Sequence, residues 1–221
     1  LMEREREIRA FNPKAYYVIE GIFSAKKETF PLTCSQEIAS ETEAIDIVAQ
    51  AEAGSWSVLD IKETAGTRKP RPPFTTSTMQ QTASSRLGFS PSRTMRAAQK
   101  LYEQGHITYM RTDSLSLSNQ ALSMIGRYVE STYGKQNLNI VAYKTKSKNA
   151  QEAHEAIRPT SFDGKGRGVT QDERALYDLI FKRAVSSQMK SADIMRTKLI
   201  ANIDGTPIPD FTTSGSRILN L

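Results

Sequence analysis

The sequence "TSTMQQTASSRLGFSPSRTMRAAQKLYEQGHITYM", residues 76–110, predicts two helices joined by a tight turn and followed by a brief strand. Hydroxyl residues open the first helix and Gly88 closes it, because Ser and Thr cap helix N-termini and Gly accepts the left-handed backbone beyond a helix end. Ser90 and Pro91 begin the second helix, and Gly105 follows its last turn. "HITYM", residues 106–110, is the brief strand.

Helix–turn–helix–strand is the core of a winged-helix module, whose second helix can lie in a DNA groove. Arg93, Arg96 and Lys100 lie on that second helix and would supply phosphate contacts. The order of elements alone leaves two readings open, a DNA-binding domain and a helical pair that binds nothing.

Segments with strand character flank this helical block on both sides. Before it lie residues 16–23, 29–35 and 55–63, and after it lie residues 196–204 and 208–215. Helical spacing occurs at 40–54, 118–134 and 170–189. We therefore predict an α+β, multi-domain fold in which a discontinuous β-rich domain carries an inserted, mostly helical domain of the winged-helix (CAP-like) kind.

The Pro-rich, basic stretch 66–74 is the clearest linker in the sequence. The predicted division is the end of an upstream helix at 1–13, a first β-rich part at 14–72, the helical domain at 73–190 and a second β-rich part at 191–221. The first and last stretches also suggest that the chain is an internal piece of a longer protein.

Composition excludes several classes of protein. The 221 residues are 38% hydrophobic and 24% charged, which is typical of an ordinary globular protein and not of a disordered or membrane-bound one. The single cysteine, Cys34, excludes an internal disulfide and a Cys-rich zinc site, and it suits a reducing compartment such as the cytoplasm. A net charge of +6 favours a polyanionic partner, but it fits a slightly basic cytosolic protein equally well.

Tyr109 lies in a setting that could make it a nucleophile. A phenol with a pKa of ~10 is ionised in only roughly one molecule per thousand at pH 7, so it needs local help. Side chains alternate along a strand, which puts Arg111 and Asp113 on the same face as Tyr109. A guanidinium there can hold the oxygens of an attacked phosphodiester and favour the phenolate. The competing interpretation is a half-buried strand tyrosine.

A second cluster, "QEAHEAIRPT" at residues 151–160, contains His154, Glu155 and Arg158. Pro159 forces Arg158 toward extended geometry. One histidine and one glutamate fall short of a zinc ligand set, so a phosphate-contacting or proton-transferring His154 is the better functional interpretation, against a solvated histidine near a helix end.

Three motifs, "PFTTSTMQQTASSRLGFS", "AQKLYEQGHITYMRTDS" and "QEAHEAIRPT", in this order, strongly resemble the central part of bacterial type IA DNA topoisomerases. By this resemblance Tyr109 is the nucleophile that forms a 5′-phosphotyrosine link with one DNA strand, Arg111 supports it at the scissile phosphate, and His154 lies near the cleavage site. Asp113 could orient His154, and Arg158 is a further expected DNA contact. The two domains would form an arch that lifts the tyrosine so that a second strand passes.

The resemblance also implies what lies elsewhere. The family needs Mg²⁺ bound by an acidic domain, and neither a spaced carboxylate triad nor a Gly-rich phosphate loop occurs in these 221 residues. We therefore expect no metal ligand in these residues and a metal-binding domain upstream in the same chain as their partner. The expected substrate is DNA, preferably single-stranded, and no association with a membrane is expected. The fragment alone is then expected to lack full activity. The alternatives are a non-catalytic winged-helix DNA-binding module and an interaction scaffold.

Overall fold

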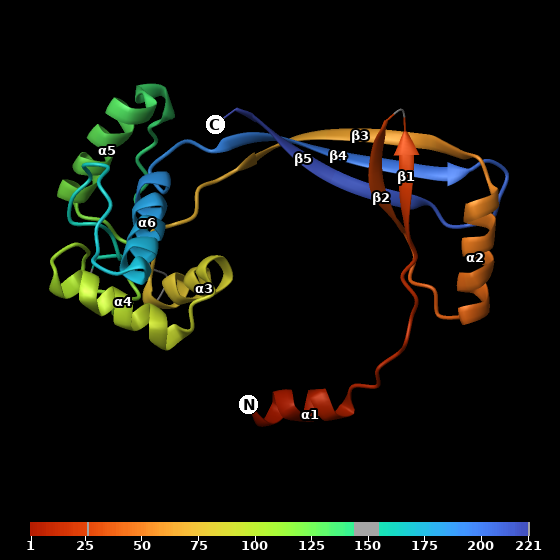
Figure 1. The fold of residues 1–221 in the computed structure, drawn as a ribbon, viewed down its shortest axis with the longest axis horizontal. Coiled ribbons are helices and arrows are strands. Elements are labelled where there is room, and N and C mark those ends of the chain that lie inside the picture. Colours follow the sequence, from red (N-terminus) through yellow and green to blue (C-terminus); the bar gives the residue numbers. More distant parts are fainter. Residues whose placement is uncertain (26, 144–154, 221) are drawn as a thin grey trace. The chain divides into compact units, whose positions relative to one another are not determined.

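The computed structural model describes residues 1–25, 27–143 and 155–220 (Figure 1). The chain divides into two compact units. The first, the β unit, contains residues 1–66 and 193–220, and the second, the helical unit, contains residues 67–192. The predicted divisions, at 72/73 and 190/191, compare with 66/67 and 192/193 in the structure.

The β unit is built on a five-stranded sheet with the order β1-β2-β5-β4-β3. Its strands are β1 (Glu20–Ala25), β2 (Glu28–Cys34), β3 (Trp56–Arg68), β4 (Ala192–Ile203) and β5 (Phe211–Asn220). β1 pairs with β2, β2 with β5 and β5 with β4, each time antiparallel. The two halves of this unit, far apart in sequence, therefore meet twice in the sheet, where β2 neighbours β5 and where β4 neighbours β3.

Two helices belong to the same unit. α2 (Glu41–Ala53) begins at Ser40, whose hydroxyl accepts from the Glu43 amide. Ala44 and Ile47 of α2 are buried with strand residues such as Leu32 and Phe211, and these residues form the core of the unit. α1 (Met2–Ala10) has no buried residue.

The helical unit consists of α3 (Thr76–Leu87), α4 (Pro91–Glu103), α5 (Asn119–Tyr133), the short 3₁₀ helix η1 (Lys135–Asn137) and α6 (Gln171–Ser186). α6 packs against α3, α4 and α5. Its buried residues Leu176 and Ile180 share one core with Met79 of α3 and Leu101 of α4. The caps agree with the sequence: Ser90 caps α4, Ser118 caps α5 and Thr170 caps α6.

The predicted α+β class is confirmed, and one predicted element is wrong. Residues 106–110 do not form a regular strand but have a single β-bridge, between Ile107 and Pro159. The amide of Thr108 donates to the Arg158 carbonyl and that of Thr160 to the His106 carbonyl. The two amides that would continue the ladder donate elsewhere, that of Arg158 to the Thr108 hydroxyl and that of His106 to the Leu101 carbonyl, so a regular ladder does not extend.

Candidate active site

Residues 106–114, which we call the tyrosine segment, follow the end of α4 and form neither a helix nor a regular strand. From Tyr109 to Ser114 the residues alternate between exposed and buried. Tyr109, Arg111 and Asp113 are exposed, and Met110 and Thr112 between them are buried. This alternation is compatible with the predicted common face of Tyr109 and Arg111, which stays a prediction, and the backbone is not part of a sheet.

The N-terminus of α3 holds the second half of the tyrosine segment. Thr76 donates its hydroxyl to the carbonyl oxygens of Met110 (2.7 Å) and Thr112 (3.1 Å). The same hydroxyl accepts from the Thr112 amide at 2.9 Å, and the Thr76 amide donates to the Thr112 carbonyl. Thr76 thus fixes the backbone on both sides of Arg111.

Residues 155–160 hold the first half of the segment. The Thr108 hydroxyl donates to the Ala156 carbonyl at 2.8 Å and accepts from the Arg158 amide at 3.0 Å. The Thr108 amide donates to the Arg158 carbonyl. Tyr109 therefore lies between two sets of backbone contacts, one at Thr108 and one at Met110, and these restrict where its side chain can point.

The Tyr109 ring is not enclosed in the core, since its side chain is 41% exposed. It packs edge to face against Tyr102 of α4, with ring centroids 5.2 Å apart. Such a contact orients the ring while leaving it open to a substrate. Tyr102 was not singled out from the sequence as a site residue, and its position seven residues before Tyr109 gives no signal of this contact.

The predicted DNA contact Arg158 lies behind the tyrosine segment and is only 13% exposed. Its guanidinium pairs with the Glu155 carboxylate at 2.6 Å and donates to its neighbour's carbonyl, that of Pro159, at 2.9 Å. Glu155 also accepts from the Ser118 amide at the start of α5 (2.7 Å). The Arg158 side chain is thus bound within the protein, where it links residues 155–160 to α5.

The electrostatics of Glu155 reflect these contacts. Partial burial alone would raise the pKa of Glu155, but the hydrogen bond from Ser118 and the attraction of Arg158 outweigh it and hold the pKa below its ordinary value. Glu155 is therefore ionised at neutral pH and serves as a structural anion.

The predicted phosphate contacts on α4 lie on its exposed surface. Arg93, Arg96 and Lys100 follow one another at helical spacing and are all exposed. Arg93 makes a bidentate pair with Asp172 at 2.7 and 2.8 Å, which lowers the pKa of Asp172. Lys100 pairs with Glu103 at 3.1 Å. Arg96 has no ion-pair partner in the described part of the chain, so it presents the most available charge of the three.

His154 lies outside the residues that the structure describes, so its predicted place near Tyr109 stays a prediction. Asp113 is exposed, like Tyr109 and Arg111. Arg111 likewise has no ion-pair partner among residues 1–25, 27–143 and 155–220.

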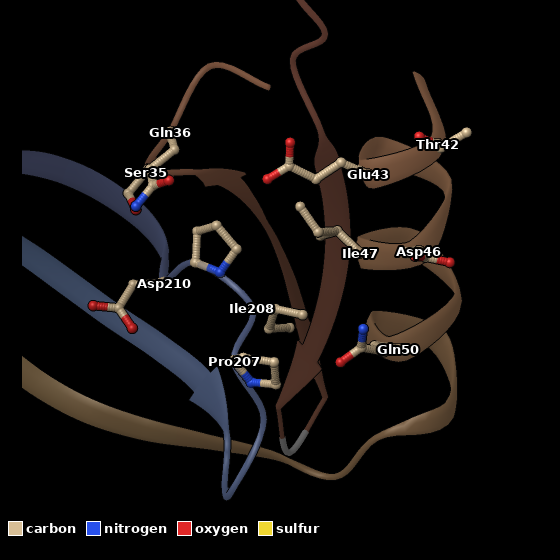
Figure 2. A pocket seen from close by; sticks show the side chains of 11 residues that line it. Ser35, Gln36, Thr42, Glu43, Asp46, Ile47, Gln50, Pro207, Ile208 and Asp210 are labelled. Atoms are coloured by element: carbon tan, nitrogen blue, oxygen red, sulfur yellow. The ribbon is translucent and has the colours of Figure 1, made fainter. Parts of the chain in front are cut away.

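Figure 2 shows a pocket of about 660 Å³ in the β unit with three carboxylates among its lining residues, Glu43, Asp46 and Asp210. Asp210 accepts from Asn202 at 2.8 Å, and the Glu43 and Asp46 side chains point in different directions (Figure 2). Within the described residues no three His, Cys, Asp or Glu side chains are grouped to hold a metal ion. The pocket is therefore not a metal site.

No described helix is long and apolar enough to cross a membrane.

Comparison with known proteins identifies the family. A family model described as "DNA topoisomerase" matches residues 1–221. DNA topoisomerase 1 of Synechocystis sp. is 38% identical over 99% of this chain and 27% of its own length, and that of Zymomonas mobilis is 40% identical over 99% and 19%.

The structural comparison agrees with this. Full-length topoisomerase I from Thermotoga maritima superposes with a TM-score of 0.70 at 28% identity, covering 99% of this chain and 36% of that one. The chain spans about a fifth to a third of the length of these proteins. With a family match along all 221 residues, and with the predicted tyrosine exposed beside its arginine, the chain belongs to the bacterial type IA DNA topoisomerase family.

Proposed function

We propose that Tyr109 cleaves one strand of DNA by transesterification. The phenolic oxygen attacks a backbone phosphorus, the bond from phosphorus to the 3′-oxygen breaks, and the 5′-phosphate becomes esterified to Tyr109. The phenol loses its proton and the leaving oxygen gains one, so the departing group is a 3′-hydroxyl. Attack by that hydroxyl on the ester reverses the step and reseals the strand without ATP. Passage of a second strand between the two events relaxes negative supercoils.

One observation supports this proposal above the others. Tyr109 and Arg111 are both exposed, two residues apart on a backbone that hydrogen bonds hold before and after Tyr109. A fixed nucleophile beside a fixed cation lowers the entropic and electrostatic parts of the barrier together.

In this mechanism Arg111 has two tasks. Its guanidinium donates to the non-bridging phosphate oxygens, whose charge grows as the pentavalent transition state forms. It also favours the phenolate over the phenol by Coulomb attraction. The substrate is preferably single-stranded DNA, because its phosphates and bases are both accessible to a protein that contacts the backbone and stacks on bases without reading their sequence.

The remaining DNA contacts divide by their availability. Arg96 and Lys100 on α4 are exposed and can meet phosphates, and Arg93 can do so when it exchanges Asp172 for DNA. Arg158 supports the tyrosine segment through Glu155, so its contribution to DNA binding is mainly indirect. His154 and Asp113 remain proposed as neighbours of the scissile phosphate.

The type IA family uses Mg²⁺. Since the described residues do not supply a ligand set for it, we assign the ion to a metal-binding domain outside residues 1–221, and no step above passes through it. That domain is the proposed partner of this chain in the intact, cytoplasmic enzyme.

The test is capture of the covalent adduct. The intact gene product is mixed with Mg²⁺ and single-stranded DNA that carries an internal radiolabel on the 3′ side of the cleavage region, and the mixture is denatured with detergent. Label should migrate with the protein for the natural sequence and disappear for Tyr109→Phe, whereas both bind DNA equally. Tyr102→Phe is the matched control and should keep forming the adduct.

Two outcomes would assign another function. DNA binding without an adduct under any divalent metal would make this chain a winged-helix binding module with an inert tyrosine. An adduct that persists in Tyr109→Phe would move the nucleophile to another residue.

A further inference from the structure

The helical unit contains a strongly basic pocket far from the tyrosine in sequence. It measures about 750 Å³ and is lined by the end of β3 and the linker after it, by the end of α3 and by the second half of α6 with the residues that follow. Seven of its twelve lining residues are Lys or Arg, and none is Asp or Glu. We call this the basic pocket.

Arg183 of α6 is the most constrained of these cations. Its guanidinium lies over the Phe74 ring, 4.1 Å from the centroid, and donates to the Pro72 carbonyl at 3.4 Å. These contacts fix a planar set of donors in the wall of the pocket. Burial lowers the pKa of Arg183, and repulsion from Arg71 and Arg86 lowers it further, although a guanidinium remains charged at neutral pH.

The cations of the basic pocket have few counter-charges. Among the residues that the structure describes, only Lys182 has an ion-pair partner, Asp178 at 2.7 Å. Arg71 and Arg86 are exposed and face the same pocket as Arg183. Like charges gathered in this way repel one another, and a bound anion would offset this repulsion because each cation attracts it.

We propose that the basic pocket is a second DNA site, which binds backbone phosphates of a strand away from the scissile phosphate. This proposal rests on the proposed function in taking DNA as the anion. Three separate stretches of the chain contribute cations, so the pocket suits successive phosphates of a strand better than one phosphate ion. The guanidinium groups also match phosphate oxygens in geometry.

The position of α3 makes the two sites distinct. Its first residue, Thr76, holds the tyrosine segment, and Arg86 near its last turn lines the basic pocket. At 1.5 Å per residue, the ten steps between them span ~15 Å. One helix thus connects the site of cleavage with a site that can hold another part of the DNA.

The experiment measures binding without cleavage. The intact gene product carrying Tyr109→Phe is titrated with fluorescein-labelled (dT)₂₀ at several salt concentrations, with and without Arg71→Gln/Arg86→Gln. We expect the double variant to raise Kd about 10-fold at 0.1 M salt. It should also reduce the slope of log K against log salt by about 1.4, which is about 0.7 for each of the two phosphates that the protein no longer neutralises. Circular dichroism checks that the fold is retained.

Arg127→Gln/Lys165→Gln is the matched control, because it removes two exposed charges of the same unit outside the basic pocket. It should change Kd less than about twofold, as expected for a long-range effect of charge alone. Equal losses in the two double variants would overturn the proposal, since net charge would then explain the binding.

Competition by tripolyphosphate identifies the kind of anion. It should displace (dT)₂₀ only at concentrations far above the Kd of the strand. Displacement at concentrations equal to that Kd would overturn the strand assignment and indicate a site for free phosphates. The adduct assay separates the two proposals. If the adduct forms but Arg71→Gln/Arg86→Gln leaves the Kd for (dT)₂₀ unchanged, only the basic pocket is refuted. If the double variant raises that Kd but no adduct forms, only the tyrosine chemistry is refuted.

Discussion

The hydroxyl of Thr76 donates to the carbonyl oxygen of Met110 at 2.7 Å, across 34 positions of sequence. Met110 directly follows Tyr109, so the first residue of α3 sets the backbone on which the proposed nucleophile lies. The bond is partly buried, and the same hydroxyl also accepts from the Thr112 amide. An oxygen that both donates and accepts in this way has no substitute in an apolar side chain of equal size.

We therefore expect Thr76→Val to slow adduct formation about 10- to 100-fold, because small displacements of a reacting group are costly in rate. DNA affinity should stay within about twofold, which a single-turnover cleavage assay beside a binding titration will separate. Thr76→Ser retains the hydroxyl and should restore most of the rate. Loss of affinity and rate together in Thr76→Val, without rescue by serine, would show a general structural defect instead.

Arg111→Ala should reduce the cleavage rate by roughly 10²–10³-fold, as for the loss of other donors to a developing oxyanion, with a much smaller effect on DNA affinity. Arg111→Lys keeps the charge but not the forked geometry, so an intermediate rate is expected. The measurement is single-turnover cleavage at saturating DNA. A drop in affinity alone would remove Arg111 from transition-state support.

Glu155→Gln should lower the free energy of unfolding by ~1–3 kcal/mol at pH 7, because it leaves the largely buried Arg158 without its anion. The pKa of Glu155 is lowered in the folded state, so its contribution is complete above the unfolded value of about 4.3 and is lost as the pH falls through the folded value. The difference between natural chain and variant, measured by urea unfolding, should therefore shrink below about pH 4. Glu130→Gln, an exposed change on α5, should show no such dependence.

Asp172→Asn should strengthen DNA binding about two- to fivefold, because it releases Arg93 from a bidentate pair and removes a negative charge beside α4. Stability should change little, since both side chains are well exposed and the ion pair is screened. A salt titration of DNA affinity measures the gain, which should vanish at high salt. Asp163→Asn, which breaks the ion pair with Arg167 in the same unit, is the control; an equal gain there would exclude a specific role for Arg93.

The sequence by itself determined the features that depend on near neighbours. Ser90 caps α4 as predicted, because a hydroxyl reaches amides only three residues away. The predicted alternation around Tyr109 is seen in burial, since Tyr109 and Arg111 are exposed and Met110 between them is buried. Helices, their ends and the exposure of the two proposed catalytic residues could therefore be predicted from the sequence.

Only the tertiary structure decided which distant groups meet. The strand predicted at 106–110 became a single bridge because the Arg158 and His106 amides donate to other acceptors. Arg158 became an internal cation because it pairs with Glu155, which the Ser118 amide holds. The basic pocket brings together cations from residues 68–71, 86 and 182–190, none of which forms a motif alone. Such contacts depend on how helices pack over one core, and packing energy is shared among many residues that no local pattern reveals.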